Sequence, residues 1–385
     1  MSNCTPPDST TPGPSATLLV IGGGIAGASV CFFAARRGWA VTLIDAGQGR
    51  ASDVPTALLN LVRGQSGKVD VRALAGLHLG WALIRELEGQ GHRVPHGQTG
   101  VLRPLASDAA RAKFEANLPP GMPHQWLAPA DSPFEVAPGW PHLLFLPQGG
   151  WVAAGALVAA LVTASGAALK PARASAWDAH SATLESGEVL HADAVVWCGG
   201  SVGASWGGAT WGGGTGFDPG GFSHRAGSLL LLERAAAPLP VSAGVYLAPA
   251  ALEGGAVQGG ELGGVLGATF EAPSSRYALI GPPLRSLHWL LERAATLSAD
   301  LSPAVTGLWT GSRLSGERTG PQPGGWWALA GLGSKGFLLG PLLAKGLVEQ
   351  LSGQLGKQLG GQLGKHPGSG PADLLTERDL SSLDG

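Results

Sequence analysis

A glycine-rich turn near the start of the chain limits the possible folds more than any other feature. Residues 17–21 are apolar and predict a β-strand, and residues 25–37 predict a helix. The sequence GGGIAG, residues 22–27, joins the two in a G-x-G-x-x-G pattern. An isolated glycine motif is weak evidence, but a strand, a glycine turn and a helix in this order are typical of the first βαβ unit of dinucleotide-binding folds.

The spacing of the glycines explains why this turn suits a phosphate ligand. Gly22 permits a tight turn, Gly24 lets the backbone approach a pyrophosphate, and Gly27 lets the helix pack close to the strand. The free amides and the dipole of the helix N-terminus then attract the phosphates. Asp45 ends the next apolar strand, residues 40–45, where a carboxylate accepts hydrogen bonds from a ribose. We therefore predict dinucleotide binding.

A second glycine motif, near the other end of the chain, bears on which dinucleotide binds. GLGSKG, residues 331–336, follows an apolar strand at 326–330 and precedes a helix at 337–351. No strand with a terminal acid follows this helix, which disfavours a second nucleotide-binding unit for NAD. A reduced flavin carries negative charge, which a helix N-terminus stabilises by about 1 to 2 kcal/mol, and Lys335 would add a cation. The motif favours FAD; a glycine-rich helix start that only packs is the alternative.

A fully apolar strand at residues 192–197 ends in the small residues Cys198-Gly199-Gly200. Small residues at this point allow a second segment of chain to pass close to a cofactor, so Gly199 and Gly200 are candidate cofactor contacts. An ordinary core strand that ends in a glycine turn explains the pattern equally well.

The two glycine motifs lie near opposite ends of the chain, which predicts an α/β fold: a Rossmann-like FAD-binding domain with an inserted antiparallel β-rich substrate domain. The expected division is a disordered leader (1–15), three FAD-binding segments (16–65, 151–210 and 311–352), two mainly substrate-domain segments (66–150 and 211–310) and a low-complexity tail (353–385). Between the motifs we expect helices at 71–90, 153–164 and 284–297, a hairpin over 182–190, and strands at 101–105, 143–146, 228–233, 243–247, 264–271 and 304–309.

Composition and charge argue against several classes of protein. The formal net charge is −2, and no block of Lys or Arg marks a surface for nucleic acid. Three distant cysteines cannot pair completely and lack metal spacing, so we expect a reducing, cytoplasmic environment and no metal. The apolar run 16–35 is interrupted by glycines, which argues against a membrane span. The sequence has no nucleophile elbow, which argues against a hydrolase. Its single His-x-x-x-His spacing, from His92 to His96, contains Pro95, which disfavours the helix that would bring two such histidines onto one face for a metal.

Four segments resemble the FAD-dependent family of D-amino-acid oxidase (DAO) type, which includes glycine and sarcosine oxidases. They are GGGIAGAS from Gly22, Arg50-Ala51-Ser52, WCGG from Trp197, and GLGSKGFLLGP from Gly331. The last of these, with GATF at 267–270, also resembles the oxidase half of the bifunctional enzymes that make 5-methylaminomethyl-2-thiouridine in tRNA. The sequence contains no methyltransferase half like theirs, and its near-neutral charge gives tRNA no electrostatic support.

The resemblance implies roles for individual residues. It assigns the ADP moiety of FAD to Ile25, Ala26, Asp45 and Ala46, the pyrophosphate and ring to Ala51, Ser52 and Ala57, the adenine side to Ala174, and the flavin to Gly331, Gly333, Ser334, Lys335, Gly336 and Phe337. Arg313 falls where the family has an arginine that pairs with a substrate carboxylate through two parallel hydrogen bonds. The Pro and acidic residues usual after that arginine are replaced here, so a surface arginine beside Glu317 is the alternative.

The sequence therefore predicts an FAD-dependent oxidoreductase that oxidises the C–N bond of a secondary amine carrying a carboxylate, with hydride passing to flavin N5. The expected partners are a small-molecule amine and dioxygen or another electron acceptor, with no membrane. One alternative is an oxidase acting on the carboxymethylaminomethyl group of a tRNA wobble uridine. The other is a flavin-binding subunit without turnover of its own, which an exposed apolar patch around residues 206–221 would favour. A flavin bond to a cysteine is not expected, because no cysteine follows Cys198.

Overall fold

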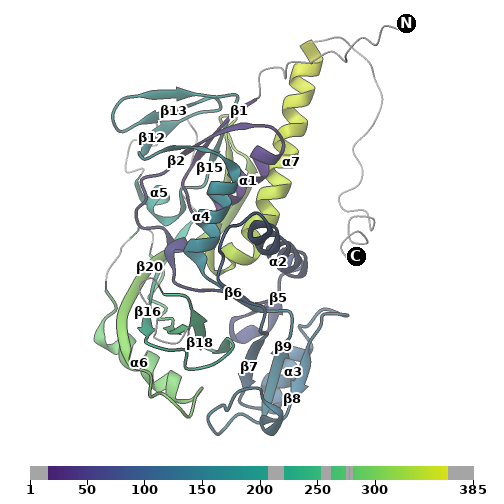
Figure 1. Ribbon diagram of the computed structural model, residues 1–385, viewed down its shortest axis with the longest axis vertical. Coiled ribbons are helices and arrows are strands. Elements are labelled where there is room, and N and C mark those ends of the chain that lie inside the picture. The colour runs from purple at the N-terminus through teal and green to yellow at the C-terminus, as the bar shows by residue number, and fades with distance from the viewer. Residues whose placement is uncertain (1–15, 207–220, 253–261, 275–276, 278–280, 363–385) are drawn as a thin grey trace, which may run out of the picture. The chain divides into compact units, whose positions relative to one another are not determined.

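The computed structural model of the chain describes residues 16–206, 221–252, 262–274, 277 and 281–362 (Figure 1). The expected leader, almost all of the glycine-rich segment 206–221 and the tail beyond residue 362 lie outside the described residues. Residues up to Val348 form one compact unit, and helix α7 (Gly336–Gln362) continues past its end. None of the described helices combines the length and the apolar character that a membrane crossing requires.

A sheet of thirteen strands, counted over the described residues, forms the frame of this unit. Its first five strands are parallel and follow the spatial order β11 (Ala168–Lys170), β2 (Ala40–Ile44), β1 (Thr17–Ile21), β15 (Ala194–Trp197) and β21 (Trp327–Leu332). Ile21 lies in register with Ile44 on one side and Trp197 on the other. The segments that follow these three strands therefore meet at one edge of the sheet, where ligands bind in open α/β sheets.

The remaining strands extend the sheet in antiparallel order, apart from one short parallel contact between β17 and β7. They are β20 (Val305–Pro321), β16 (Ser223–Leu232), β19 (Gly263–Gly267), β18 (Val245–Ala250), β17 (Val241–Ala243), β7 (Val101–Leu105), β9 (His142–Leu146) and β8 (Gln125–Leu127). The long strand β20 joins the two parts, because it pairs with β21 on one side and with β16 on the other.

Helices pack on both parts of the sheet. α1 contacts α4, β1 and β2, and α6 contacts β18 and β19. The bounds are α1 (Ile25–Arg36), α2 (Ala73–Gly89), α3 (Asp108–Glu115), α4 (Ala154–Ser165), α5 (Gly200–Trp206) and α6 (Leu284–Ala295), with short 3-10 turns η1 (Ala51–Asp53), η2 (Gly64–Ser66), η3 (Pro129–Asp131) and η4 (Gly333–Lys335). Small sheets contain β3 (Ala57–Leu59), β10 (Gly150–Val152) and β6 (His96–Gly97); β12 (Ala174–Trp177), β13 (Ser181–Leu184) and β14 (Val189–His191); and β4 (Val62–Arg63) with β5 (Lys68–Val69).

The predicted βαβ start, the apolar strand before Cys198 and the last strand and helix are all present, in the mixed α/β architecture that the sequence predicts. The hairpin expected over 182–190 is formed by β13 and β14. The division into FAD-binding and substrate segments stays a prediction. The sequence patterns miss α3 and α5, and Trp206 ends α5 instead of opening a loop.

Several predicted elements have different limits; for example, the strand predicted at 264–271 ends at Gly267 and the one predicted at 228–233 begins at Ser223. The strand predicted at 304–309 continues as β20 to Pro321, because β16 pairs with it as far as Ser315 and β21 pairs with it from Ser315 to Pro321. The strand predicted at 243–247 is broken by Gly244, whose φ of +87° turns the chain between β17 and β18. The last helix reaches Gln362 and takes in the start of the expected low-complexity tail, where leucine, glutamine and lysine favour helix more than the glycines oppose it.

Candidate functional site

One cavity of about 1020 Å³ takes its walls from the glycine turn after β1, the loop after β21 and the antiparallel strands. This volume lies at the upper end of the range of about 300 to 1,000 Å³ that small-molecule and cofactor sites occupy. The cavity brings together every predicted site residue except Gly27: Gly22, Gly24, Ile25, Ala26, Asp45, Ala46, Ala51, Ser52, Ala57, Ala174, Gly199, Gly200, Arg313, Gly331, Gly333, Ser334, Lys335, Gly336 and Phe337.

Gly27 does not line the cavity, but it makes the glycine turn between β1 and α1 possible. A β-carbon on Gly27 would stand 1.8 Å from the carbonyl oxygen of Gly22, so only glycine allows α1 to pack this closely against the end of β1. Gly22 itself has a φ of +103°, and its β-carbon would stand 2.5 Å from the carbonyl oxygen of Cys198. Both glycines therefore serve the backbone geometry that the sequence motif implies.

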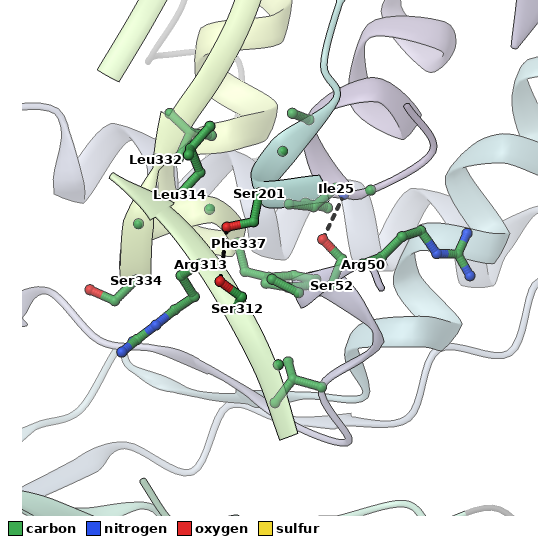
Figure 2. A pocket seen from close by; sticks show the side chains of 18 of the residues that line it. Ile25, Arg50, Ser52, Ser201, Ser312, Arg313, Leu314, Leu332, Ser334 and Phe337 are labelled. Atoms are coloured by element: carbon green, nitrogen blue, oxygen red, sulfur yellow. Dashed lines mark hydrogen bonds between the residues drawn. The ribbon is translucent and has the colours of Figure 1, made fainter. Parts of the chain in front are cut away.

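The N-terminus of α1 opens into the cavity beside Ser52. The amide of Ile25 donates a hydrogen bond to the Ser52 hydroxyl oxygen at 3.0 Å (Figure 2). A β-carbon on Gly24 would meet only this serine, at 3.1 Å from its oxygen. The space in front of the helix is thus open to a ligand, and the proton of the Ser52 hydroxyl is free to turn toward it.

Asp45 is held beside the glycine turn by Arg50, which belongs to the segment Arg50-Ala51-Ser52. Its carboxylate lies 3.3 Å from Nη1 of Arg50, and Arg50 also pairs with Asp53 at 3.0 Å. A β-carbon on Gly23 would come within 2.7 Å of the Asp45 carboxylate, so the turn and the acid are in direct contact. This places an acceptor at the carboxyl end of β2, where a ribose hydroxyl would bind.

The loop after β21 is anchored by a cluster of four charges. Lys335 donates to Asp70 at 2.6 Å, and Arg72 bonds both to Asp70, at 2.9 Å, and to Glu317, at 2.6 Å. Arg72 and Lys335 hold the pKa of Asp70 well below its usual range, and Arg72 also lowers the pKa of Glu317. The Lys335 ammonium that the sequence assigned to the flavin is thus shared with Asp70, and its main observed role is to fix the loop.

Asp70→Asn is expected to destabilise the protein by about 1.5 to 3 kcal/mol, because it weakens the charged hydrogen bonds that a carboxylate of 15% exposure makes to Lys335 and Arg72. Since folding lowers the pKa of Asp70, its contribution is complete above the pKa of an unfolded aspartate and disappears as the pH falls. Urea unfolding at neutral and acid pH measures both effects. Glu86→Gln is the control, because the Glu86–Arg36 pair is exposed and is worth about 1 kcal/mol or less. Equal losses in the two variants would contradict the assignment.

The antiparallel end of the cavity is cationic. Arg313 lies in the middle of β20, directly across from Arg225 on β16, and both arginines line the cavity. Burial lowers the pKa of Arg313 below its ordinary value; nearby Tyr246 opposes this shift and Arg225 adds to it. Within the described part of the chain, neither arginine forms an ion pair with a carboxylate. Facing like charges are unfavourable, so this end favours an anionic ligand.

The alternative position for Arg313, on the surface beside Glu317, is wrong. Glu317 pairs with Arg72, whereas the guanidinium of Arg313 lies over the ring of Phe270 at 5.3 Å. In Figure 2 the Arg313 side chain extends away from Ser52 and the start of α1. The two ends of the cavity therefore offer different groups to a ligand. Backbone amides line the end at the glycine turn, and two facing guanidinium groups, from Arg225 and Arg313, line the other end.

Several wall residues carry no signal in the sequence. Arg103, Arg225, Ser242 and Tyr246 come from four strands that are brought together only by sheet pairing. Burial raises the pKa of Tyr246 to about 12, so its hydroxyl stays protonated at any ordinary pH. Cys198 also lines the cavity, and burial raises the pKa of its thiol, in agreement with an inert cysteine.

Comparison with known proteins identifies the family. Residues 17–350 match the family described as "DAO: FAD dependent oxidoreductase". The chain belongs to this DAO family. FAD is therefore its cofactor, and flavin-dependent oxidation or reduction is its chemistry.

Similar DAO proteins include solved structures and curated enzymes. Glycine oxidase from Geobacillus kaustophilus is 25% identical, with a TM-score of 0.71 over 87% of this chain and 95% of that chain. Iminodiacetate oxidase from Chelativorans sp. BNC1 is 20% identical, with a TM-score of 0.71 over 86% of this chain and 95% of that chain, which shows a shared fold. The tRNA 5-methylaminomethyl-2-thiouridine biosynthesis bifunctional protein of Azoarcus sp. strain BH72 is 34% identical over 175 residues, 41% of this chain. That match spans 27% of the Azoarcus protein, about a quarter of its length.

The residues present fit the DAO cofactor. FAD needs a long cavity, a close approach to a helix N-terminus for its pyrophosphate, and an acceptor for its ribose. The chain offers all three, since Gly24 leaves the helix start open and Asp45 stands beside it. The loop after β21 brings a second set of small residues to the same cavity, from Gly331 to Gly336.

Proposed function

We propose that this DAO-family protein oxidises the C–N bond of a secondary amine that carries a carboxylate. The observation that supports the proposal most strongly is the pair of arginines, Arg225 and Arg313, at the end of the cavity remote from the glycine turn. A guanidinium group binds a carboxylate through two parallel hydrogen bonds, and partial burial strengthens them. The names of the glycine and iminodiacetate oxidases agree with an amino-acid substrate of this kind.

The proposed positions of FAD follow the cavity from one end to the other. The turn with Gly22, Gly24, Ile25 and Ala26 would hold the pyrophosphate, Asp45 and Ala46 the ribose, Ala174 the adenine side, Ala51, Ser52 and Ala57 the middle of the cofactor, Gly199 and Gly200 its flank, and Gly331, Gly333, Ser334, Lys335, Gly336 and Phe337 the flavin. A flavin held by these residues would supply the hydride acceptor for the reaction, with dioxygen or another electron acceptor as the second substrate.

The chain's own residues position the substrate. Arg313 would bind the carboxylate, with Tyr246 and Arg225 beside it, and so hold the carbon next to nitrogen against the flavin. Hydride loss from that carbon turns the amine into an imine, and water cleaves the imine to an oxo acid and an amine. The only carboxylate among the described cavity residues is Asp45, at the glycine turn, and no described histidine lines the cavity. We therefore infer that the substrate ammonium loses its proton without a protein base.

This inference predicts how the rate depends on pH. Anaerobic flavin reduction is expected to become faster as pH rises through the pKa of the substrate's own ammonium group, because only the neutral amine gives up hydride. N-(2,2,2-trifluoroethyl)glycine, a weaker base than N-ethylglycine, should move the profile to lower pH by the difference between the two amines. Stopped-flow absorbance measures both profiles. If the pH profile is the same for the two amines, a protein group controls the rate instead. His224, which hydrogen-bonds to cavity-lining Ser201 at 3.0 Å, is such a group.

Anaerobic flavin bleaching with a substrate panel tests the proposed function. The panel contains N-alkyl glycines, D-amino acids, carboxymethylaminomethyl-uridine and, as a compound without nitrogen, a 2-hydroxy acid, with the methyl ester of each active acid as its control. We expect at least one acid to bleach the flavin and its ester to fail, because the ester carries no charge for Arg313. If no amine in the panel bleaches the flavin and a hydroxy acid does, C–N oxidation is the wrong reaction. The uridine compound tests the tRNA alternative, which rests on a match to about a quarter of the bifunctional proteins.

A further inference from the structure

We infer that Arg103 forms a second anion-binding subsite in the cavity, and that the preferred substrate is an amino diacid whose second carboxylate binds there. The inference rests on the proposed function, because it names the class of amine that the same cavity takes. It starts from a charged residue that the proposed reaction leaves unused.

Arg103 is a buried cation without an acidic partner. Its side chain is only 3% exposed, and no carboxylate of the described residues lies within ion-pairing distance of it. Burial lowers its pKa to about 10, so the guanidinium is still charged at neutral pH. A buried charge is costly unless a counter-charge or several hydrogen bonds compensate for it. The protein itself supplies little of that compensation.

Several N–H groups of the Arg103 guanidinium lack a hydrogen-bond partner among the described residues. One terminal nitrogen donates to the carbonyl oxygen of Gly64 at 2.5 Å, and the other lies 3.5 Å from the hydroxyl of Ser242, at the limit of a hydrogen bond. Nε has no partner in the described chain although it is buried. The guanidinium also lies over the ring of Phe114, 5.5 Å from the ring centroid. An arginine offers five N–H donors, so most of them are left for a ligand.

These groups belong to the wall of the cavity. Arg103 and both of its hydrogen-bond partners, Gly64 and Ser242, line the same cavity as Arg313. Gly64 and Ser242 come from segments on either side of Arg103, so the guanidinium stands between two pieces of the wall. A carboxylate bound at this part of the cavity would therefore lie beside the guanidinium.

Sheet pairing sets the separation of the two subsites. β7, which carries Arg103, lies next to β17, where Ser242 is in register with Tyr246 of β18. Tyr246 interacts electrostatically with Arg313. Neighbouring strands lie about 4.8 Å apart, so Arg103 is about 10 Å along the sheet from Tyr246. Three more strand spacings separate Tyr246 from Arg313 on β20, and the side chains of Arg103, Tyr246 and Arg313 span this distance across the cavity that they share. A ligand with two carboxylates several bonds apart would bridge the two arginines.

A binding series that cannot react provides the test. The probes are thioether diacids, HOOC–CH₂–S–(CH₂)n–COOH with n from one to four, each matched to the thioether monoacid in which a methyl group replaces the second carboxyl. The holoenzyme is titrated with each probe, and binding is read from the change in flavin absorbance and from thermal stabilisation. We expect wild type to bind the best diacid at least about tenfold more tightly than its monoacid, with a maximum at one value of n.

Two variants locate the effect. Arg103→Met keeps the length of the side chain without the charge and should bring the diacid-to-monoacid ratio to about one, with monoacid binding unchanged. Arg111→Met is the matched control, because Arg111 also lies over an aromatic ring, Trp126 at 4.9 Å, but does not line the cavity. Should Arg103→Met fail to fold, Arg103→Lys replaces it and should keep a reduced preference, since a point charge lacks the two parallel bonds.

The outcomes separate this inference from the proposed function. Equal binding of diacids and monoacids by wild type would overturn the Arg103 subsite, even if N-alkyl glycines reduce the flavin. A preference that survives Arg103→Met would overturn it as well. If the Arg103-dependent preference is found but no amine reduces the flavin, the subsite stands and C–N oxidation fails.

Discussion

Gly24→Val is expected to yield a folded protein that does not retain FAD, with at least about a tenfold loss of cofactor content. A β-carbon at Gly24 meets only Ser52, at 3.1 Å from its hydroxyl oxygen, and the φ of −73° is open to any residue, so the protein itself needs only a small shift of the Ser52 side chain. The side chain would instead fill the space in front of α1, which is reserved for the pyrophosphate. The ratio of flavin to protein absorbance, with release of FAD by heat, measures the loss.

Gly27→Ala is the informative comparison, because it should lower the stability of the fold itself and not only the binding of FAD. Its β-carbon would stand 1.8 Å from the backbone oxygen of Gly22, and backbone cannot move aside as a flexible side chain can. Overpacking of this kind costs about 1 to 3 kcal/mol or more. We expect Gly27→Ala to lower stability to urea in the apoprotein, whereas apo Gly24→Val unfolds like wild type. Normal FAD content in Gly24→Val would contradict the assignment of the turn.

Arg313→Ala is expected to reduce the efficiency of flavin reduction by the active amino acid at least tenfold and leave FAD content unchanged. Charged hydrogen bonds are worth about 1.5 to 3 kcal/mol each, and the loss of one corresponds to about ten- to a hundredfold. Arg313→Lys should recover only part, because an ammonium cannot form both bonds of the guanidinium. Anaerobic stopped-flow reduction over a range of substrate concentrations measures the effect.

The control for this prediction comes from the same strand. Arg318 also lies on β20, but it stacks on Phe222 at 4.6 Å and does not line the cavity. Arg318→Ala should therefore leave the reduction rate within about twofold of wild type. Equal rates in wild type and Arg313→Ala would show that the substrate carboxylate binds elsewhere.

The cofactor side of the site could be predicted from sequence because its determinants are local. In the turn from Gly22 to Gly27, three glycines are required by a contact within the turn or with the end of an adjacent strand: Gly22, Gly23 and Gly27. Gly24 is not required by such a contact and leaves the start of the helix open. Glycine is also required in the loop from Gly331 to Gly333, where positive φ angles of +75° and +58° need it. Patterns of this kind depend on chain geometry and can be read without knowing the fold.

The substrate side could not be predicted in this way, because its residues are assembled by long-range pairing. Arg103 and Ser242 meet only because β7 lies beside β17, and no spacing in the sequence indicates that contact. Arg313 was identified through family resemblance, and its neighbour Arg225 was missed because it depends on the register of β16 with β20. The salt bridge between Lys335 and Asp70 was missed for the same reason, since it joins distant segments.

The most direct test of C–N oxidation is a single turnover without oxygen. Holoenzyme is mixed with an equal amount of N-propylglycine, or of the most active acid in the panel, and the products are quantified once the flavin is bleached. We predict one glyoxylate and one propylamine for each flavin reduced by N-propylglycine, with no reduction in a sample that contains only the methyl ester of the acid. A bleached flavin with the N-propylglycine recovered intact, or a flavin that bleaches only with a substrate lacking nitrogen, would contradict this prediction.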